Sequence, residues 1–221
     1  MHPLQSIVPA LQGAGLLVVL LGLNLHLFTG SIPGTFIYSQ HEVLAGEWWR
    51  IITHPFVHVS WYHLLLDTSA VVILWQMLSS RSPLQRLLAA STCSILSLVF
   101  ALLFSPYISQ TGYCGLSGVA HGLVTLFALS CCSAPKRDAL QSAVGLILFL
   151  AIAAKSGLEV HHRRVIFTSL HLGELGQPIV HAHLGGVVGG MVSWLFFPDL
   201  LQKPALPRRW ANLTCRTRRA K

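Results

Sequence analysis

The sequence contains the stretch Gly115-Leu116-Ser117-Gly118-Val119-Ala120-His121-Gly122, a run of small residues that holds one serine. It opens an apolar segment that continues through Leu129. Glycine and serine at such positions usually let two membrane helices approach closely, so the run alone predicts a packing site. A serine framed by glycines at the start of a buried helix is also a candidate nucleophile. The residues around it distinguish these two interpretations.

The 221-residue chain is apolar and poor in charge. Hydrophobic residues make up 53% of it and charged residues 10%, whereas soluble domains carry about 25% charged residues. A membrane helix needs about 20 apolar residues, so several such helices leave no room for a sizeable soluble domain. We therefore expect an all-α membrane protein, with one transmembrane domain at residues 1–198 and a basic cytoplasmic tail at residues 199–221.

The basic charge is concentrated in that tail. The net charge is +8, and seven of the 15 Lys and Arg residues follow residue 200. This distribution is typical of a segment beside anionic lipid, which makes the lipid bilayer the expected partner and excludes nucleic acid. The five cysteines contain no C-x-x-C pair, so neither a disulfide framework nor a cysteine metal site is predicted.

Hydropathy divides the chain into six predicted membrane spans. These lie at residues 11–28, 60–78, 84–104, 113–130, 139–154 and 178–197. Residues 30–59 are too polar to span and too apolar for a free linker, and Trp48 and Trp49 suit a membrane interface. We expect a partly embedded loop with a short helix there. The side that holds both termini carries 11 Lys and Arg against 4 on the other side, so both termini are predicted to be cytoplasmic.

Three polar residues on different predicted spans fall at one depth. Spans two, four and six all begin on the outer side, and His63, Ser117 and His183 each lie within about one and a half turns of that surface, given a rise of about 1.5 Å per residue. Ionisable groups inside membranes are costly and usually functional. A serine and a histidine that meet can form an activated nucleophile with its general base. The helix start at Ser117 would also favour a developing oxyanion.

At this point the sequence resembles the rhomboid family of intramembrane serine proteases over residues 47–198. Its G-x-S-G pattern is met by Gly115, Ser117 and Gly118, and its A-H-x-x-G-x-x-x-G pattern by Ala182, His183, Gly186 and Gly190. Its W-R pair corresponds to Trp49 and Arg50. Its H-x-x-x-N motif aligns with His63 and Asp67.

The resemblance implies a six-helix bundle with a catalytic Ser117–His183 dyad, no third carboxylate and no cofactor. It implies that His63 and the Ser117 N–H hold the oxyanion, and that residues 155–177 form a mobile cap. His181 is the alternative base. We expect Gly118, Gly186 and Gly190 to pack helices together, and Gly115 to leave room for the substrate backbone.

The sequence departs from the family pattern at two positions. Asp67 replaces the usual Asn, although an ionised carboxylate only accepts hydrogen bonds and would repel an oxyanion. His121 stands where the family often has Tyr, and one turn below Ser117 it could still pack on His183. Both changes lie one turn below site residues. One interpretation is that Asp67 and His121 form a buried polar pair; the other is independent drift at both positions.

The short chain, the Gly-Leu-Ser-Gly-x-x-His-Gly run and the stretch Ala45-Gly46-Glu47-Trp48-Trp49-Arg50 are most similar to the rhombosortase branch. That likeness implies a bacterial inner-membrane enzyme whose site opens to the periplasmic side. Its implied partners are membrane-anchored protein substrates, namely exported proteins with a C-terminal Gly-Gly motif, an apolar helix and a basic end.

Two other functions remain open from the sequence. A catalytically inactive rhomboid-like protein would bind transmembrane segments without cleaving them, and Asp67 is the feature that favours it. A metal-dependent membrane protein is suggested by the 12 histidines. The chain lacks an H-E-x-x-H motif, however, and His181 and His183 do not share a helical face, so no metal is predicted.

Overall fold

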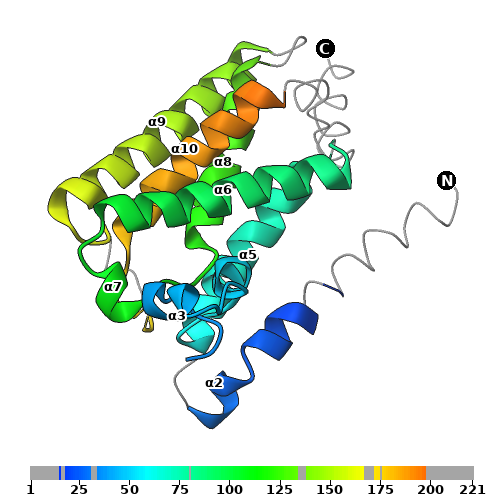
Figure 1. Cartoon of the computed structure of the whole chain (residues 1–221). Helices are drawn as coiled ribbons and strands as arrows, with labels where there is room; N and C mark the ends of the chain where they lie inside the picture. The colour runs from blue at the N-terminus through cyan, green and yellow to red at the C-terminus, as the bar shows by residue number, and fades with distance from the viewer. Residues whose placement is uncertain are drawn as a thin grey trace, which may run out of the picture.

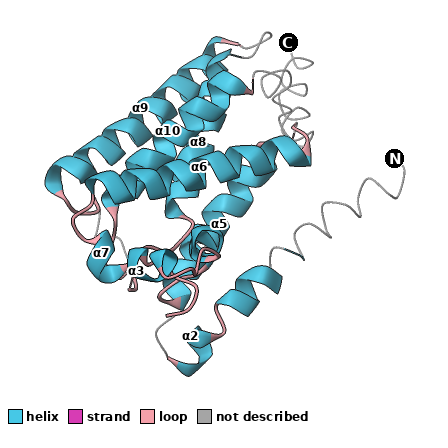
Figure 2. Ribbon diagram, in the orientation of Figure 1, coloured by secondary structure: helices cyan, strands magenta, loops and turns pink. Residues whose placement is uncertain are grey.

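A computed structural model describes residues 15, 18–30, 34–79, 81–133, 138–166, 172–174 and 176–197. Within these ranges the regular structure is helical, and the β-type pairing is one isolated bridge between Tyr38 and Tyr113 (Figure 2). The expected all-α class is confirmed.

Five long helices correspond to predicted spans two to six. They are α5 (Trp61–Met77), α6 (Pro83–Phe104), α8 (Ser117–Ser133), α9 (Ala139–His162) and α10 (Val180–Phe196) (Figure 1). Of the first predicted span, residues 15 and 18–28 are described; residues 18–23 are helical and are followed by the short helix α2 (His26–Thr29). The predicted tail at 199–221 also lies outside them.

The helices differ in their capacity to cross a membrane. By length and composition, α6 and α9 are long and apolar enough. A third span results if α5 is combined with residues 50–56, which meet it at a bend of 93°. Helices α8 and α10 are apolar but only 17 residues long. The described structure therefore supports two or three spans on these criteria, and six remains a prediction.

Side-chain caps fix where three of the helices begin. The Ser60 hydroxyl accepts a hydrogen bond from the His63 N–H at 3.0 Å and starts α5. Ser82 and Gln85 form a reciprocal capping box at the start of α6, and Asp138 caps α9. Such caps satisfy backbone N–H groups that lack a helical partner, and the first one sets the level of His63.

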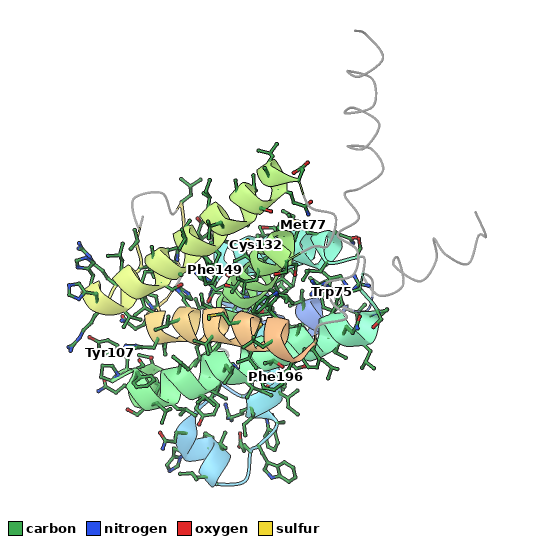
Figure 3. All side chains as sticks on the ribbon, turned by 90° about the horizontal axis from the view of Figure 1, so that it is seen from above. Trp75, Met77, Tyr107, Cys132, Phe149 and Phe196 are labelled. Atoms are coloured by element: carbon green, nitrogen blue, oxygen red, sulfur yellow. The ribbon has the colours of Figure 1, made fainter. Side chains whose placement is uncertain are left out.

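Helix α10 lies between α6 and α9 when the molecule is seen from above (Figure 3). Its glycines allow close contact on two faces. A Cβ on Gly189 would lie 2.6 Å from the backbone of Cys93 in α6, and a Cβ on Gly186 would clash with the carbonyl oxygen of Gly118 in α8. Gly190 meets the Gly122 carbonyl in the same way. The predicted packing role of Gly118, Gly186 and Gly190 agrees with this geometry.

The connection before α5 is a series of short helices, as expected for a segment that does not span. It comprises α3 (Gln40–Leu44), α4 (Arg50–Thr53) and the 3-10 helix η1 (His54–Phe56), and α3 contacts the short helix α7 (Ile108–Thr111). The buried Arg50 guanidinium binds the Glu47 carboxylate at 2.6 Å and the Ile37 carbonyl at 2.9 Å. Arg50 thereby links α4 to the start of the same connecting segment.

One predicted boundary is wrong, with consequences for the site. Helix α9 does not end at residue 154 but continues to His162, so the predicted loop at 155–177 begins only after the helix. The prediction ended the span at Lys155 because hydropathy drops at this charged residue. In the fold, however, the Lys155 charge is paired with Glu159. Lys155 and Glu159 lie one turn apart and form an ion pair of 2.6 Å, which lets both stay in a helix.

Candidate active site

A cavity of about 480 Å³ opens where the N-terminal ends of α5, α8 and α10 meet the C-terminal end of α9. Much of its wall is apolar. The ionisable and hydroxyl side chains that line it include Tyr62, His63, Asp67, Tyr113, Ser117, His121, Lys155 and His183. His63, Ser117 and His183, which the sequence predicted to lie at one depth, thus line the same cavity.

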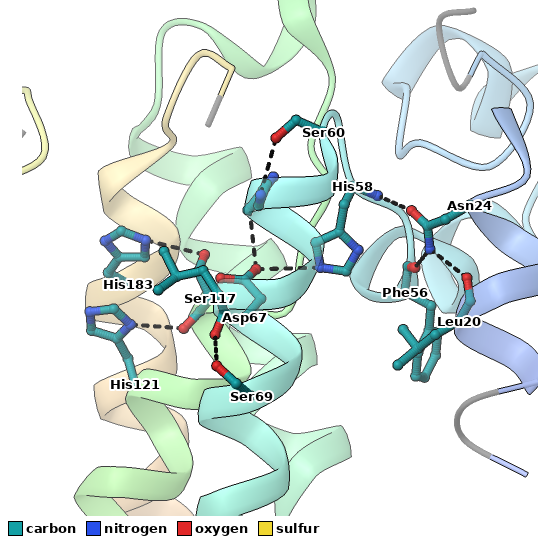
Figure 4. Close-up of polar contacts among 12 residues, drawn as sticks. Leu20, Asn24, Phe56, His58, Ser60, Asp67, Ser69, Ser117, His121 and His183 are labelled. Atoms are coloured by element: carbon teal, nitrogen blue, oxygen red, sulfur yellow. Dashed lines mark hydrogen bonds and ion pairs between the residues drawn. The ribbon is translucent and has the colours of Figure 1, made fainter. Parts of the chain in front are cut away.

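Ser117 and His183 are in contact across two helices. The Ser117 hydroxyl oxygen lies 3.2 Å from the His183 Nε2 (Figure 4). Ser117 is the first residue of α8, and His183 lies in the first turn of α10. His181 instead faces the Phe104 ring and lines a separate small cavity. His183, rather than His181, is thus placed to accept the serine proton.

The backbone at Ser117 also has donors available in principle. The first N–H groups of a helix have no intrahelical partner, and the helix dipole adds partial positive charge. Helix α8 starts at Ser117 itself. The Ala120 N–H, inside the helix, donates to the carbonyl of Leu116, the residue before the helix, at 2.9 Å. An oxyanion formed beside Ser117 would therefore lie near unpaired N–H groups.

Glu159 is the main residue that sequence reasoning missed. Its side chain has no exposed surface, and its Oε2 lies 2.7 Å from the His183 Nδ1. Its Oε1 receives the Lys155 ammonium at 2.6 Å and the Ile166 backbone N–H at 3.1 Å. The expectation of no third carboxylate is therefore wrong for the geometry of the site. The available signal was the Lys-x-x-x-Glu spacing, which belongs on a helix rather than in a loop.

His121 packs on the candidate base, as expected. The rings of His121 and His183 are stacked with centroids 4.2 Å apart and an interplanar angle of 5°. The His121 Nδ1 lies 2.7 Å from the Ser117 carbonyl oxygen, and its Nε2 lies 3.1 Å from the Lys155 ammonium. A carbonyl only accepts, so Nδ1 carries the proton and Nε2 accepts from Lys155.

Asp67 belongs to a different cluster. Its Oδ2 lies 3.2 Å from the His63 Nε2 and 3.5 Å from the His58 Nε2 (Figure 4). No direct ion pair joins Asp67 to His121 within the described residues, and each side chain has other partners. His58 comes from the turn before α5, where its backbone N–H donates to the Asn24 side chain at 2.8 Å, and sequence spacing gave no sign of this contact.

The same cluster explains Gly115. Its φ of 103° is a conformation that favours glycine, and an added Cβ would lie 2.8 Å from the His63 Nε2 and 3.1 Å from the Asp67 Oδ2. Gly115 therefore makes room for these two side chains. The expectation that it leaves room for the substrate backbone stays a prediction.

Three side chains are close enough to be considered as metal ligands. Ligand atoms of His121, Glu159 and His183 all lie within 4.8 Å of one another. However, the two parallel imidazoles direct their in-plane lone pairs along separate planes, and Lys155 contacts both Glu159 and His121. A chelating geometry would require these contacts to break, so we assign no metal to the cluster.

Comparison with protein families shows a match to the rhomboid domain over residues 45–199. Among curated proteins, none matches the chain. The rhomboid match spans more than half of the 221 residues and contains the whole Ser117–His183–Glu159 cluster. Rhomboid proteins are generally intramembrane serine proteases that act on membrane protein substrates, and the apolar helices agree with an integral membrane protein. This chain belongs to the rhomboid family.

Proposed function

We propose that the protein is an intramembrane serine endopeptidase that uses Ser117 as nucleophile and His183 as general base. One observation carries this proposal: the 3.2 Å contact between the Ser117 hydroxyl and the His183 Nε2, inside a largely apolar cavity of a rhomboid-family chain. In this proposal the domain has six membrane helices, the first at residues 11–28, with both termini cytoplasmic and the cavity facing the opposite side.

The proposed reaction follows from the positions of these groups. The Ser117 oxygen attacks the carbonyl carbon of the scissile peptide while its proton passes to the His183 Nε2. The peptide C–N bond then breaks, and His183 returns the proton to the leaving amine. Water hydrolyses the acyl-enzyme by the reverse sequence, which releases a carboxyl end and restores Ser117. The oxyanion would lie beside the N–H groups at the start of α8, with His63 on the same cavity wall.

For the substrate, we propose exported bacterial proteins with a C-terminal tail made of a Gly-Gly motif, an apolar helix and a basic end. The likeness to the rhombosortase branch supports this choice. The apolar wall of the cavity, which includes Ile37, Val59 and Leu66, suits a membrane segment. A helix must unwind before its backbone reaches a serine, and glycine favours unwinding. The enzyme would work in the bacterial inner membrane.

The test uses a fluorophosphonate probe on the detergent-solubilised protein. We expect the wild type to be labelled, and the Ser117→Ala and His183→Ala variants to lose labelling while keeping the wild-type thermal transition. Without labelling of the wild type, the inactive membrane-segment-binding protein becomes the better description.

Substrate choice needs a second experiment. We expect co-expression with an exported protein that carries the Gly-Gly, apolar and basic tail to yield a new C-terminus near the glycines, detected by mass spectrometry. The same C-terminus with the Ser117→Ala variant would reject this substrate class while leaving the labelling result intact.

A further inference from the structure

Glu159 is a buried carboxylate whose two oxygens are divided between two tasks. One oxygen, Oε2, contacts the His183 imidazole at 2.7 Å. The other, Oε1, is held by the Lys155 ammonium at 2.6 Å and by the Ile166 backbone N–H at 3.1 Å. Three contacts from three directions fix the carboxylate, and none of its side-chain surface is exposed.

The chemistry of these groups determines where the His183 proton lies. Oε1 already receives two N–H donors, and an ionised carboxylate can only accept hydrogen bonds. The His183 Nδ1 must therefore carry the proton that points to Oε2. In a neutral imidazole this leaves the lone pair on Nε2, and Nε2 is the atom that lies 3.2 Å from the Ser117 hydroxyl. Glu159 thus selects the tautomer that can accept the serine proton.

From this geometry we propose that Glu159 is a positioning residue that completes a Ser117–His183–Glu159 triad, with Lys155 and the Ile166 N–H as its support. The proposal rests on the protease function proposed above. When His183 takes the serine proton it becomes an imidazolium, and Glu159 stabilises that charge at 2.7 Å. The proton on Nδ1 stays on His183 throughout, since the carboxylate itself gains no proton.

Because of Lys155, the hydrogen bonds of Glu159 would change if one carboxylate oxygen were replaced by an NH₂ group. The Lys155 ammonium and the Ile166 N–H both require an acceptor at the Oε1 position. A glutamine at position 159 would therefore turn its carbonyl oxygen toward these donors and its NH₂ toward the His183 Nδ1. That orientation favours the opposite tautomer, with the Nε2 proton facing Ser117. The amide would be nearly isosteric with the carboxylate and yet place the base in its wrong form.

The first experiment measures the rate of fluorophosphonate labelling in four proteins. We expect Glu159→Gln to label at least about 100-fold more slowly than the wild type, the scale on which the wrong tautomer acts in such triads. Lys155→Met keeps the carboxylate and should lose less than about tenfold. The double variant Lys155→Met/Glu159→Gln removes both charges of the ion pair, so neither is left buried without its partner. If the role of Glu159 were purely structural, this variant would be labelled at the same rate as Lys155→Met.

We expect the double variant to remain at least about 100-fold slower than Lys155→Met. Glu42→Gln serves as the matched control, because Glu42 lies in an exposed short helix and its carboxylate faces His41. This control should label at the wild-type rate. Thermal transitions of all variants in the same detergent separate loss of folding from loss of reaction.

A second readout does not depend on turnover. Nuclear magnetic resonance of protein labelled with ¹⁵N-histidine should assign His183, by its absence in His183→Ala, as the Nδ1–H tautomer in the wild type and as the Nε2–H tautomer in Glu159→Gln. Equal labelling of Glu159→Gln and wild type, or a tautomer that does not change, overturns the triad and leaves the protease intact. A wild type that is not labelled overturns the proposed function and the positioning role together.

Discussion

Two carboxylate–histidine clusters flank Ser117, and they are built differently. Glu159 is held by three well-formed hydrogen bonds. Asp67 lies within 3.5 Å of two imidazoles, but these contacts lack hydrogen-bond geometry, and its Oδ2 is without a hydrogen-bond partner within the described residues. The nitrogen atoms of His58 and the Nδ1 of His63 are in the same situation.

The two clusters therefore differ in what their histidines contact, and this difference predicts where a negative charge matters. Glu159 contacts the histidine that touches the serine, so in the proposed reaction its negative charge would act on the imidazole that takes the proton. Asp67 contacts His58 and His63, neither of which is the imidazole in contact with Ser117. The first cluster should therefore be sensitive to charge and the second should tolerate an amide.

The largest effect on labelling is expected from a substitution that separates Ser117 from His183 without changing either side chain. In Gly186→Ala the new Cβ would clash with the Gly118 carbonyl, so α10 must move away from α8 and His183 from Ser117. A displacement of about 1 Å at a reacting group can cost about 100-fold in rate. We expect fluorophosphonate labelling to fall by at least that much.

Gly157→Ala in α9 is the matched control for this substitution, because its added Cβ would meet no atom of another segment within 4 Å. Alanine is favoured over glycine in a helix by about 1 kcal/mol, so this variant should be as stable as the wild type or more so, and equally reactive. Normal labelling of Gly186→Ala would show that the contact between the two helices does not set the Ser117–His183 distance.

A moderate effect is expected from the ring that supports His183. His121→Ala removes the stacked ring, and aromatic pairs contribute about 0.5–1.5 kcal/mol, so labelling should slow by roughly two- to tenfold. His121→Phe keeps a ring and should lose less than His121→Ala. Labelling rates of the two variants are the measurement. Equal losses in both would assign the effect to the lost contact between His121 and Lys155 rather than to the ring stack.

The smallest effect is expected in the second cluster. Asp67→Asn keeps the size of the side chain and adds donors, and we expect the rate of labelling to stay within about threefold of the wild type. Set beside Glu159→Gln, this substitution tests the comparison itself. A loss as large as that of Glu159→Gln would mean that the charge of Asp67 also supports the reaction, for example by holding His63 as an imidazolium that donates to the oxyanion.

Sequence patterns were sufficient to predict the helical class, the long helices α5, α6, α8, α9 and α10 apart from their ends, and the meeting of Ser117 with His183. These predictions succeeded because hydropathy indicates roughly where each helix starts. The starts of α5, α8 and α10 line the same cavity, so residues near these starts come together. The sequence patterns failed at Glu159 because a charged residue was taken to end a span. The fold neutralises that charge with Lys155 one turn away, a contact that hydropathy does not register.

The surroundings of Asp67 were unpredictable for another reason. Asp67 meets His58 only because η1 and α5 are joined by a sharp bend, and the angle of a bend is not encoded in residue periodicity. Asn24 then fixes the turn by binding the His58 N–H and the Phe56 carbonyl. Contacts between separate segments of this kind depend on tertiary packing, so local spacing did not indicate the contact between Asp67 and His58.

In the proposed six-span arrangement, the short length of α8 and α10 has a consequence for the surrounding bilayer. At 17 residues each, these helices extend about 25 Å, given about 1.5 Å per residue, whereas the hydrocarbon core of a bilayer is about 30 Å thick. A segment shorter than the bilayer is accommodated by local thinning. Hydrophobic mismatch would thus bring the polar headgroup region, and the water that hydrolysis consumes, toward the helix ends that carry Ser117 and His183.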